Sequence, residues 1–246
     1  MFYDFSWSHQ PEKGRFKNKG KDDWESEKLL ALTRELQPDI LVNDRLDIPG
    51  DYTTPEQAQP RGPLYKDGKP VVWEACHTLN GSWGCHRDNL NWKSPRMLVE
   101  MLIDCVSKNG NLILNIGPNA RGEFDLRTMG TLEAIGEWMR LHNTAIYGCR
   151  ASEFEAPSGC RLTQNGKKLY VHLFHWPMNH LWLDGLADKA SFARLLSDGS
   201  EIRIMKKQPW GLDAHGDASD QRDALMLELP IQRPDVLVPV IELTLT

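Results

Sequence analysis

The feature that most constrains the fold is a repeated alternation of strand and helix patterns over the first 150 residues. Runs rich in apolar residues cover 39–45, 71–76 and 111–117, and the first of them ends in polar residues. Such runs are typical of parallel strands buried on both faces. Apolar residues at helical spacing cover 22–37, the segment that begins at Ser94-Pro95, and about 126–142. This alternation predicts a parallel sheet covered by helices, either doubly wound or closed into a TIM-type barrel.

The pattern changes near residue 150. Short strand-like runs, several with alternating apolar and polar residues, continue to the carboxyl terminus, and turn signals such as Asn165-Gly166 and Asp198-Gly199 separate them. No segment of helical length interrupts them. This pattern predicts an antiparallel β-sandwich of about six or seven strands. We therefore expect two domains, 1–149 and 150–246.

Composition excludes several classes of protein. Apolar residues make up 40% of the 246 residues, charged residues 26%, and the net charge is −5, which is typical of a soluble globular protein. No basic run indicates a nucleic-acid partner, and no stretch reaches the length of a membrane span. Five cysteines without a C-x-x-C pair predict neither a disulfide framework nor a zinc site. We expect no cofactor and no metal ion, and without a signal peptide on this chain the cellular location stays open.

In a β/α barrel, reacting groups lie where strands end and in the loops that follow. That rule selects the following positions: Asp4, Asn43-Asp44-Arg45, Glu56, Trp73-Glu74, Trp83 and Asn115. An Asp and a Glu that share a pocket with aromatic neighbours are the groups that glycoside hydrolysis needs. Asp44 adjoins Arg45 and is better explained by a structural role. The spacing alone leaves another two-carboxylate hydrolase open.

Several motifs, in order, resemble one family. They are FYDFSW, LQPDILVNDR, TTPEQ, WEACHTLNGSWGCHRD, SKNGNLILNIGPNARGEF and GEWMRLHNTAIYG. Together they are similar to segments of the α-L-fucosidases of glycoside hydrolase family 29, from residue 2 to about 150. The resemblance implies the carboxyl-terminal half of a (β/α)8 TIM-type barrel, followed by a small antiparallel β-sandwich domain.

The resemblance also implies an activity, namely retaining hydrolysis of terminal α-L-fucose from oligosaccharides and glycoconjugates. Asp4 lies at the position of the nucleophile, and Arg45 matches an arginine that reaches the sugar and the nucleophile. Glu56 matches the acid/base. Two aromatic residues would bind the substrate, with Trp83 against the methyl face of the sugar and Phe2 on the pocket floor.

Glu74 is the alternative acid/base. Glu56 falls in a long loop and is expected to lean freely over the leaving group. Glu74 falls inside a strand, where we expect it to pair with a residue such as Arg45, which would lower its pKa. A general acid needs a raised pKa, so this expectation favours Glu56.

The chain departs from the family in two ways. Cys85 stands where the family has a Tyr after Ser-Trp-Gly. The family's first half-barrel, which supplies the histidines that grip fucose, has no counterpart here, and none of the eight histidines inherits that role. We expect the missing amino-terminal half-barrel or a second copy of the chain as a partner. Alternatively, the chain is a non-catalytic remnant or a carbohydrate-binding fragment.

Overall fold

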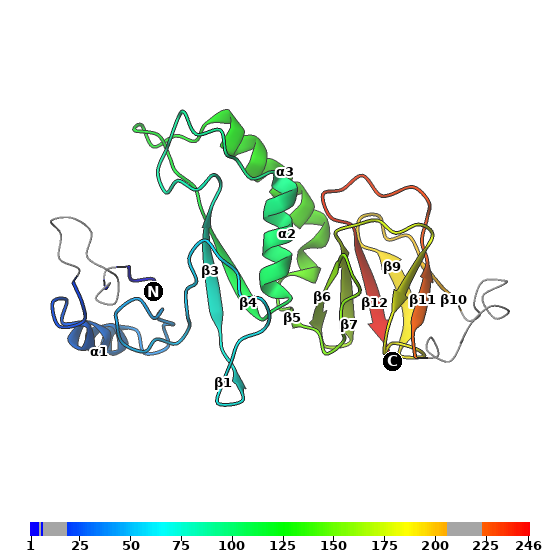
Figure 1. Ribbon diagram of the computed structural model, residues 1–246, viewed down its shortest axis with the longest axis horizontal. Coiled ribbons are helices and arrows are strands. Elements are labelled where there is room, and N and C mark those ends of the chain that lie inside the picture. The colour runs from blue at the N-terminus through cyan, green and yellow to red at the C-terminus, as the bar shows by residue number, and fades with distance from the viewer. Residues whose placement is uncertain (5, 7–18, 206–222) are drawn as a thin grey trace. The chain divides into compact units, whose positions relative to one another are not determined.

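The computed structural model describes residues 1–4, 6, 19–205 and 223–246 (Figure 1). These fall into two compact units, one of residues 1–77 with 110–113 and one of residues 78–109 with 114–246. Each unit is described by itself. The Gly- and Lys-rich segment 9–21, which the sequence predicts to be a loop, lies largely outside the described residues.

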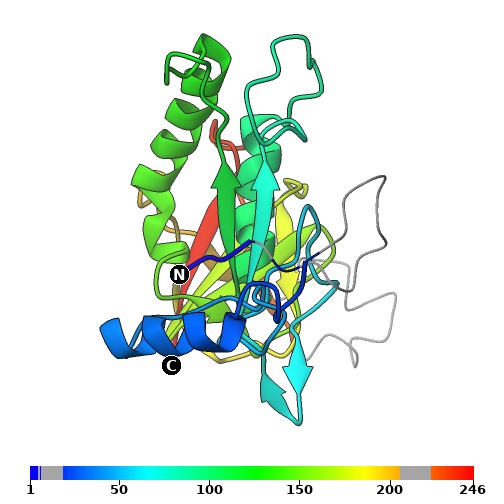
Figure 2. The same cartoon turned by 90° about the vertical axis from the view of Figure 1, so that its left-hand side faces the viewer.

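The first unit contains the regular elements nearest the predicted carboxylates. They are α1 (Ser26–Leu36), the short hairpin of β1 (Tyr65–Lys66) and β2 (Lys69–Pro70), β3 (Trp73–Thr78), and the start of β4 (Gly110–Asn115). β3 and β4 are hydrogen-bonded neighbours, and their arrows run in the same direction in Figure 2. Two of the three predicted strands are therefore confirmed, although most side chains of β4 are only half-buried.

The third predicted strand, over 39–45, is not a regular strand. Only Asn43 forms a bridge there, a parallel one with Tyr52. Side chains take some of the backbone groups that a ladder would need. The Asp51 carboxylate accepts from the Val42 amide at 2.7 Å, and the Asn43 side chain bonds both the amide and the carbonyl of Tyr3. Backbone bonds remain from the Asn43 amide to the Met1 carbonyl and from the Asp51 amide to the Val42 carbonyl. The prediction of a regular strand was wrong, because these side chains replace part of the ladder.

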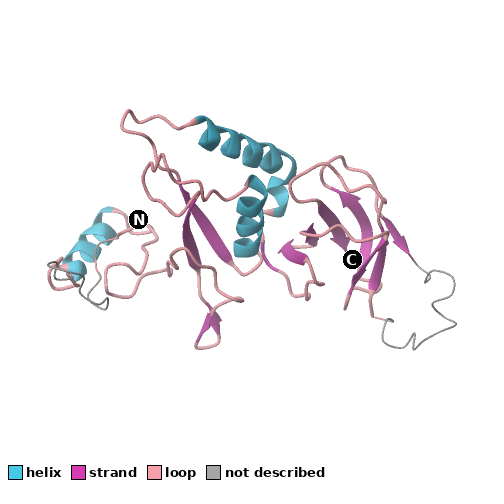
Figure 3. Cartoon of the chain, turned by 45° about the horizontal axis from the view of Figure 1, so that its top comes forward, coloured by secondary structure: helices cyan, strands magenta, loops and turns pink. Residues whose placement is uncertain are grey.

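The second unit begins with two capped helices. Ser94 accepts a hydrogen bond from the Met97 amide at 3.2 Å and begins α2 (Pro95–Val106), and Asp125 accepts from the Thr128 amide at 2.7 Å and begins α3 (Leu126–His142). A 3-10 turn, η1 (Asn143–Ala145), follows. The two helices pack together and share an apolar core with the strands that follow (Figure 3). The sequence predicted both helices correctly.

Two antiparallel sheets complete this unit. One has the order β5-β6-β7-β12-β9 and the other β10-β11-β8. Their bounds are β5 Arg150–Ala151, β6 Cys160–Asn165, β7 Lys168–Leu173, β8 His180–Leu183, β9 Ala190–Leu195, β10 Arg203–Met205, β11 Leu225–Glu228 and β12 Val240–Leu245. Both sheets contribute fully buried side chains to one core, such as Leu169, Ile241 and Leu227. The two sheets hold eight strands among the described residues, one or two more than expected, and β5 has only two residues, too few to show alternation.

The compact units do not coincide with the expected boundary at 149/150. α2 packs on β6 as well as on α3, so both helices group with the sheets. The division into domains 1–149 and 150–246 stays a prediction. No helix of the described residues is long and apolar enough to cross a membrane.

Two histidines are buried in the core of the second unit. The Nδ1 group of His142 donates to the Trp138 carbonyl at 2.8 Å, and the rings of these two residues stack at 4.8 Å. The Thr163 hydroxyl donates to the Ala145 carbonyl, so it accepts from Nε2 of His172 at 2.8 Å. The second nitrogen of each ring has no partner among the described residues.

Burial holds both histidines neutral. It lowers the pKa of His172 to about 3, with the charge of His142 as a smaller cause. Burial also lowers the pKa of His142, although the Trp138 carbonyl opposes this. A second proton on either ring would place an N–H without an acceptor in an apolar core, which is costly.

We predict that the second unit loses stability as the pH falls below about 6.5. The unfolded histidines protonate there while the folded ones stay neutral, so each contributes a loss of up to about 1.4 kcal/mol per pH unit. Chemical denaturation between pH 7.5 and 5 should show this slope, and His172→Gln should reduce it. The exposed His86→Gln is the matched control. An unchanged slope in His172→Gln would contradict the prediction.

Candidate functional site

One arginine joins the two predicted catalytic carboxylates. Nη1 of Arg45 lies 2.7 Å from Oδ1 of Asp4 and 2.9 Å from Oε2 of Glu56. The arginine side chain is only 8% exposed, whereas those of Asp4 and Glu56 are 51% and 40% exposed. A buried guanidinium therefore faces two carboxylates that are open to a ligand.

This geometry limits the distance between the carboxylates. Because both oxygens contact the same nitrogen, their separation cannot exceed the sum of the two contacts, about 5.6 Å. The two groups come from segments 52 residues apart in the chain. The structure thus brings Asp4, Arg45 and Glu56 together.

The chain around Glu56 is not the free loop expected from the sequence. Residues 53–57 run alongside β3, with parallel bridges from Thr53 to Trp73 and from Glu56 to Cys76. Backbone hydrogen bonds of 2.9–3.1 Å fix the segment along its length. The expectation that Glu56 leans freely was wrong, because its backbone is paired on both sides of the residue.

Phe2 and Thr54 also contact the guanidinium group of Arg45. The ring of Phe2 lies 5.1 Å from the guanidinium, a cation–π distance. Asp44 accepts a hydrogen bond from the Thr54 amide at 3.1 Å, and the Thr54 carbonyl accepts from Nη2 of Arg45 at 3.3 Å. Asp44 therefore ties the segment that carries Glu56, which agrees with the structural role expected for it.

Glu74 lies in a different environment from the one expected. Burial is the main influence and raises the pKa of Glu74, while a hydrogen bond from the Tyr52 hydroxyl lowers it to a smaller extent. The pKa of Tyr52 is raised as well, first by burial and then by the Glu74 charge. The prediction that Glu74 has a lowered pKa was wrong, and the carboxylate found on Arg45 is that of Glu56.

Sequence reasoning missed Tyr52 and Cys76. Burial raises the pKa of the Cys76 thiol, and the charges of Arg45, Glu56, Asp4 and Glu74 all influence it. The signal for Cys76 was its place on β3 two residues after Glu74, which puts both on the same face of the strand. For Tyr52 no local signal existed, because its partner is 22 residues away.

Trp83 belongs to the second unit, in the loop that follows β3. Its side chain is 44% exposed. Its carbonyl accepts a hydrogen bond of 2.7 Å from Nδ2 of Asn115, at the end of β4. Cys85, at the position of the family's tyrosine, is an exposed free thiol.

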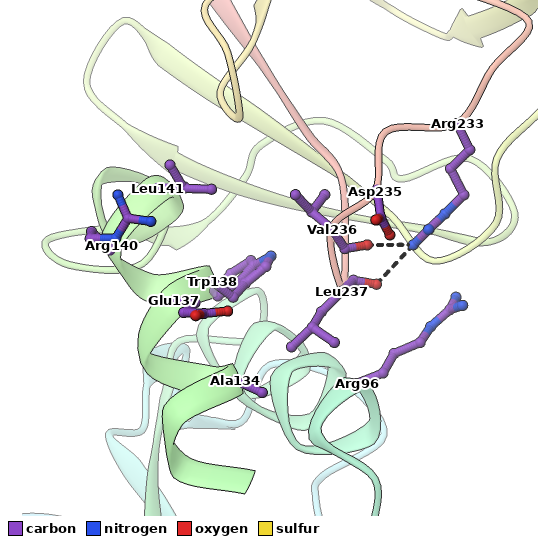
Figure 4. A pocket seen from close by; sticks show the side chains of 10 residues that line it. All are labelled: Arg96, Ala134, Glu137, Trp138, Arg140, Leu141, Arg233, Asp235, Val236 and Leu237. Atoms are coloured by element: carbon purple, nitrogen blue, oxygen red, sulfur yellow. Dashed lines mark hydrogen bonds between the residues drawn. The ribbon is translucent and has the colours of Figure 1, made fainter. Parts of the chain in front are cut away.

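A cavity of about 420 Å³ also lies in the second unit, between α2, α3 and the segment 233–237 (Figure 4). It contains none of the predicted site residues. Two of its three arginines bind parts of the fold. Arg233 donates to the carbonyls of Val236 and Leu237, and Arg96 donates to Glu100 and to the Phe174 carbonyl. Among the described residues no cluster of three or more His, Cys, Asp or Glu could hold a metal ion.

Comparison with known proteins gives a consistent result. The family model for alpha-L-fucosidase matches residues 1–144. Tissue alpha-L-fucosidase from Bos taurus is 26% identical over 229 residues, which are 88% of this chain and 46% of that protein. The chain spans about half the length of the curated relatives it matches.

Solved structures agree with this. Alpha-L-fucosidase isoenzyme 1 from Paenibacillus thiaminolyticus superposes with a TM-score of 0.86 and 38% identity, over 100% of this chain and 57% of that one. A GH29 alpha-L-fucosidase from Bacteroides thetaiotaomicron, solved as a trapped covalent intermediate with 2-fluoro-fucosyl fluoride, gives a TM-score of 0.77. At 23% identity, over 95% of this chain and 55% of that one, this second likeness concerns the fold alone.

We predict that Arg45→Met destabilises the first unit at pH 7 by about 1.5–3 kcal/mol, the range of hydrogen bonds to charged groups. Asp4 and Glu56 would lose the cation that contacts both of them. Urea unfolding at pH 7 measures the loss, with Arg87→Met, which removes an exposed ion pair, as the control. An Arg45→Met variant as stable as the control would contradict the prediction.

Proposed function

Because the chain belongs to the α-L-fucosidase family, we propose that it supplies the carboxyl-terminal half of a (β/α)8 catalytic barrel and a carboxyl-terminal β-sandwich. In a completed barrel it would hydrolyse terminal α-L-fucose from glycoconjugates. The parallel bridges of residues 43–56 and the paired strands β3 and β4 support the half-barrel. The two sheets around one core support the sandwich.

The observation that carries the proposed chemistry is the contact of both carboxylates with Nη1 of Arg45. Retaining glycosidases hold their two carboxyl groups about 5–5.5 Å apart. The upper limit of about 5.6 Å for the oxygens of Asp4 and Glu56 agrees with that requirement. A water molecule placed between the carboxylates, as in inverting enzymes, needs a larger separation.

The reaction then follows in two steps. Asp4 attacks the anomeric carbon of the fucosyl group while Glu56 gives its proton to the departing oxygen, so that a glycosyl ester forms on Asp4. Glu56, now ionised, takes a proton from water, and the resulting hydroxide attacks the same carbon and releases Asp4.

One observation favours Glu74 as the acid/base, and another favours Glu56. Glu74 has the raised pKa that a general acid needs, whereas Glu56 contacts the cation that also binds the nucleophile. A general acid is judged first by its reach to the reacting atoms and then by its pKa. We therefore place Glu56 in this role and keep Glu74 as the alternative. In this scheme Glu56 leaves Arg45 when it is protonated, because a neutral acid gains little from a cation.

Phe2 and Trp83 are proposed to bind the sugar. Phe2 lies against Arg45 and would form part of the pocket floor. Trp83 exposes 44% of its side chain, enough for an apolar sugar face to pack on it.

We propose that the partner of this chain is an amino-terminal half-barrel. Exposed apolar side chains of the first unit support such a contact, since Leu32, Leu36, Leu41 and Val72 are each at least 50% exposed. Burial of a large apolar side chain stabilises by about 1.5–3 kcal/mol. A second copy of the chain is the alternative partner, and a non-catalytic role follows if neither partner completes a site.

We predict negligible turnover of an aryl α-L-fucoside by the purified chain alone. Groups that hold a substrate in an attack geometry contribute about 7–11 kcal/mol in favourable cases. This chain spans only 46% of the length of its bovine relative. Co-expression with the amino-terminal half-barrel of a family relative should restore turnover and give a joint peak in size exclusion. Asp4→Asn in that complex is the control and should be inactive. Turnover by the lone chain within tenfold of a complete relative would contradict the prediction.

We predict that Glu56→Gly in the completed barrel spares the first step on a fucoside with a good leaving group. Such a leaving group needs no proton, whereas the second step loses its base and slows. Azide, which needs no base, should then restore turnover and give a fucosyl azide. Glu74→Gly is the matched control and should show no rescue. The opposite result would assign the acid/base to Glu74.

A further inference from the structure

The loop that carries Trp83 contacts the last residue of β4 and the segment that follows it. We propose that Asn115 and Gly117 are positioning residues that set the Trp83 loop and thereby determine selectivity for 6-deoxy sugars. The inference about selectivity rests on the proposed function. The positioning of the loop is argued from contacts within the second unit alone.

The side chain of Asn115 is hydrogen-bonded to the backbone of Trp83. The side-chain amide of Asn115 donates to the Trp83 carbonyl at 2.7 Å across 32 residues of chain. Since the contact uses the carbonyl, the indole is not needed for it and remains 44% exposed. A backbone anchor next to an open aromatic ring suits a residue that presents its ring to a ligand.

Gly117 allows a close approach of two backbone segments. A Cβ atom at this position would lie 2.5 Å from the Gly84 carbonyl carbon, 2.7 Å from its oxygen and 2.8 Å from the Cys85 nitrogen. All three are backbone atoms, which cannot rotate away as a side chain can. The backbone of Gly117 is not in the left-handed region, so the position needs glycine for space alone.

Internal hydrogen bonds brace the rest of the loop. The Gly81 amide donates to the Thr78 hydroxyl at 2.7 Å, and the Ser82 amide donates to the Asn80 side chain at 3.1 Å. Asn89 donates to the Asn80 carbonyl at 2.7 Å. A braced loop moves as one body, so a displacement at Gly84 would change the direction of Trp83.

The space behind the loop is small. A cavity of about 20 Å³ lies between the loop and the residues after β4, with Ser82, His86, Asn115 and Asp125 among its lining. A space of this size holds a single water molecule. The loop therefore has little room to retreat, and an added methyl group at Gly117 has to push it outward.

The chemistry of the ring gives the selectivity. An indole is apolar and favours a methyl group over a hydroxymethyl group, which would have to give up hydrogen bonds to water. Fucose is a 6-deoxy sugar and carries that methyl group. One such group in an apolar pocket gives a discrimination of about 10- to 200-fold, and a displaced Trp83 should lose most of it.

Hydrogen exchange of the chain itself tests the positioning. In Asn115→Asp, which keeps the shape but removes the N–H donor, and in Gly117→Ala, the amides of Gly81 and Ser82 should exchange at least about tenfold faster. The matched controls are Asn111→Ala on the same strand and Gly130→Ala, where an added Cβ meets no atom within 4 Å. Unchanged exchange in Asn115→Asp overturns the proposal. If Gly117→Ala fails to fold, Asn115→Asp alone decides.

The completed barrel tests selectivity. The ratio of kcat/KM for an aryl α-L-fucoside over the matching α-L-galactoside should fall about tenfold or more in Asn115→Asp and stay unchanged in Asn111→Ala. Faster exchange with an unchanged ratio overturns the claim of selectivity. A completed barrel without fucosidase activity, together with faster exchange in the chain, would refute the proposed function and leave the positioning role intact.

Discussion

The candidate site depends on the contacts that the guanidinium group of Arg45 makes. A charge that is only 8% exposed needs counter-charges and hydrogen-bond acceptors, and here two carboxylates and the Thr54 carbonyl supply them. These partners come from the amino-terminal residues and from the segment that runs beside β3. The same contacts that satisfy one buried cation thus bring the oxygens of two carboxylates within about 5.6 Å of each other.

Elements with local signals could be predicted from the sequence. Ser94 and Asp125 cap helices whose apolar spacing is regular, and β3 and β4 lie in runs rich in apolar residues. The segment 39–45 has the same apolar run but no regular strand, because the Asp51 and Asn43 side chains bond its surroundings. The competing contacts arise from residues whose partners are 9 and 40 positions away, and periodicity does not record them.

Some features of the candidate site could likewise be predicted from the sequence, and others depend on tertiary contacts. The residues Asp4, Arg45 and Glu56 could be selected from ordered motifs, and the structure places them in contact. The environment of Glu74 could not be predicted, since the pKa of a carboxyl group on a strand depends on how deeply the folded chain buries it. The fastening of the Trp83 loop also depends on tertiary structure. From the local sequence, Asn115 and Gly117 are predicted only to end a strand and to form a turn. The folded chain shows that they approach the backbone of residues 83–85.

The shared contact with Arg45 constrains the proposed two-carboxylate mechanism. In that mechanism Asp4 has to attack as a carboxylate, whereas Glu56 first has to give a proton and then has to act as a base. Nη1 of Arg45 contacts both groups. A cation that contacts Glu56 suits the second of these two tasks and not the first. The proposed mechanism therefore requires substrate binding to separate Glu56 from Arg45 before the first step, and it allows the contact to form again before the second step.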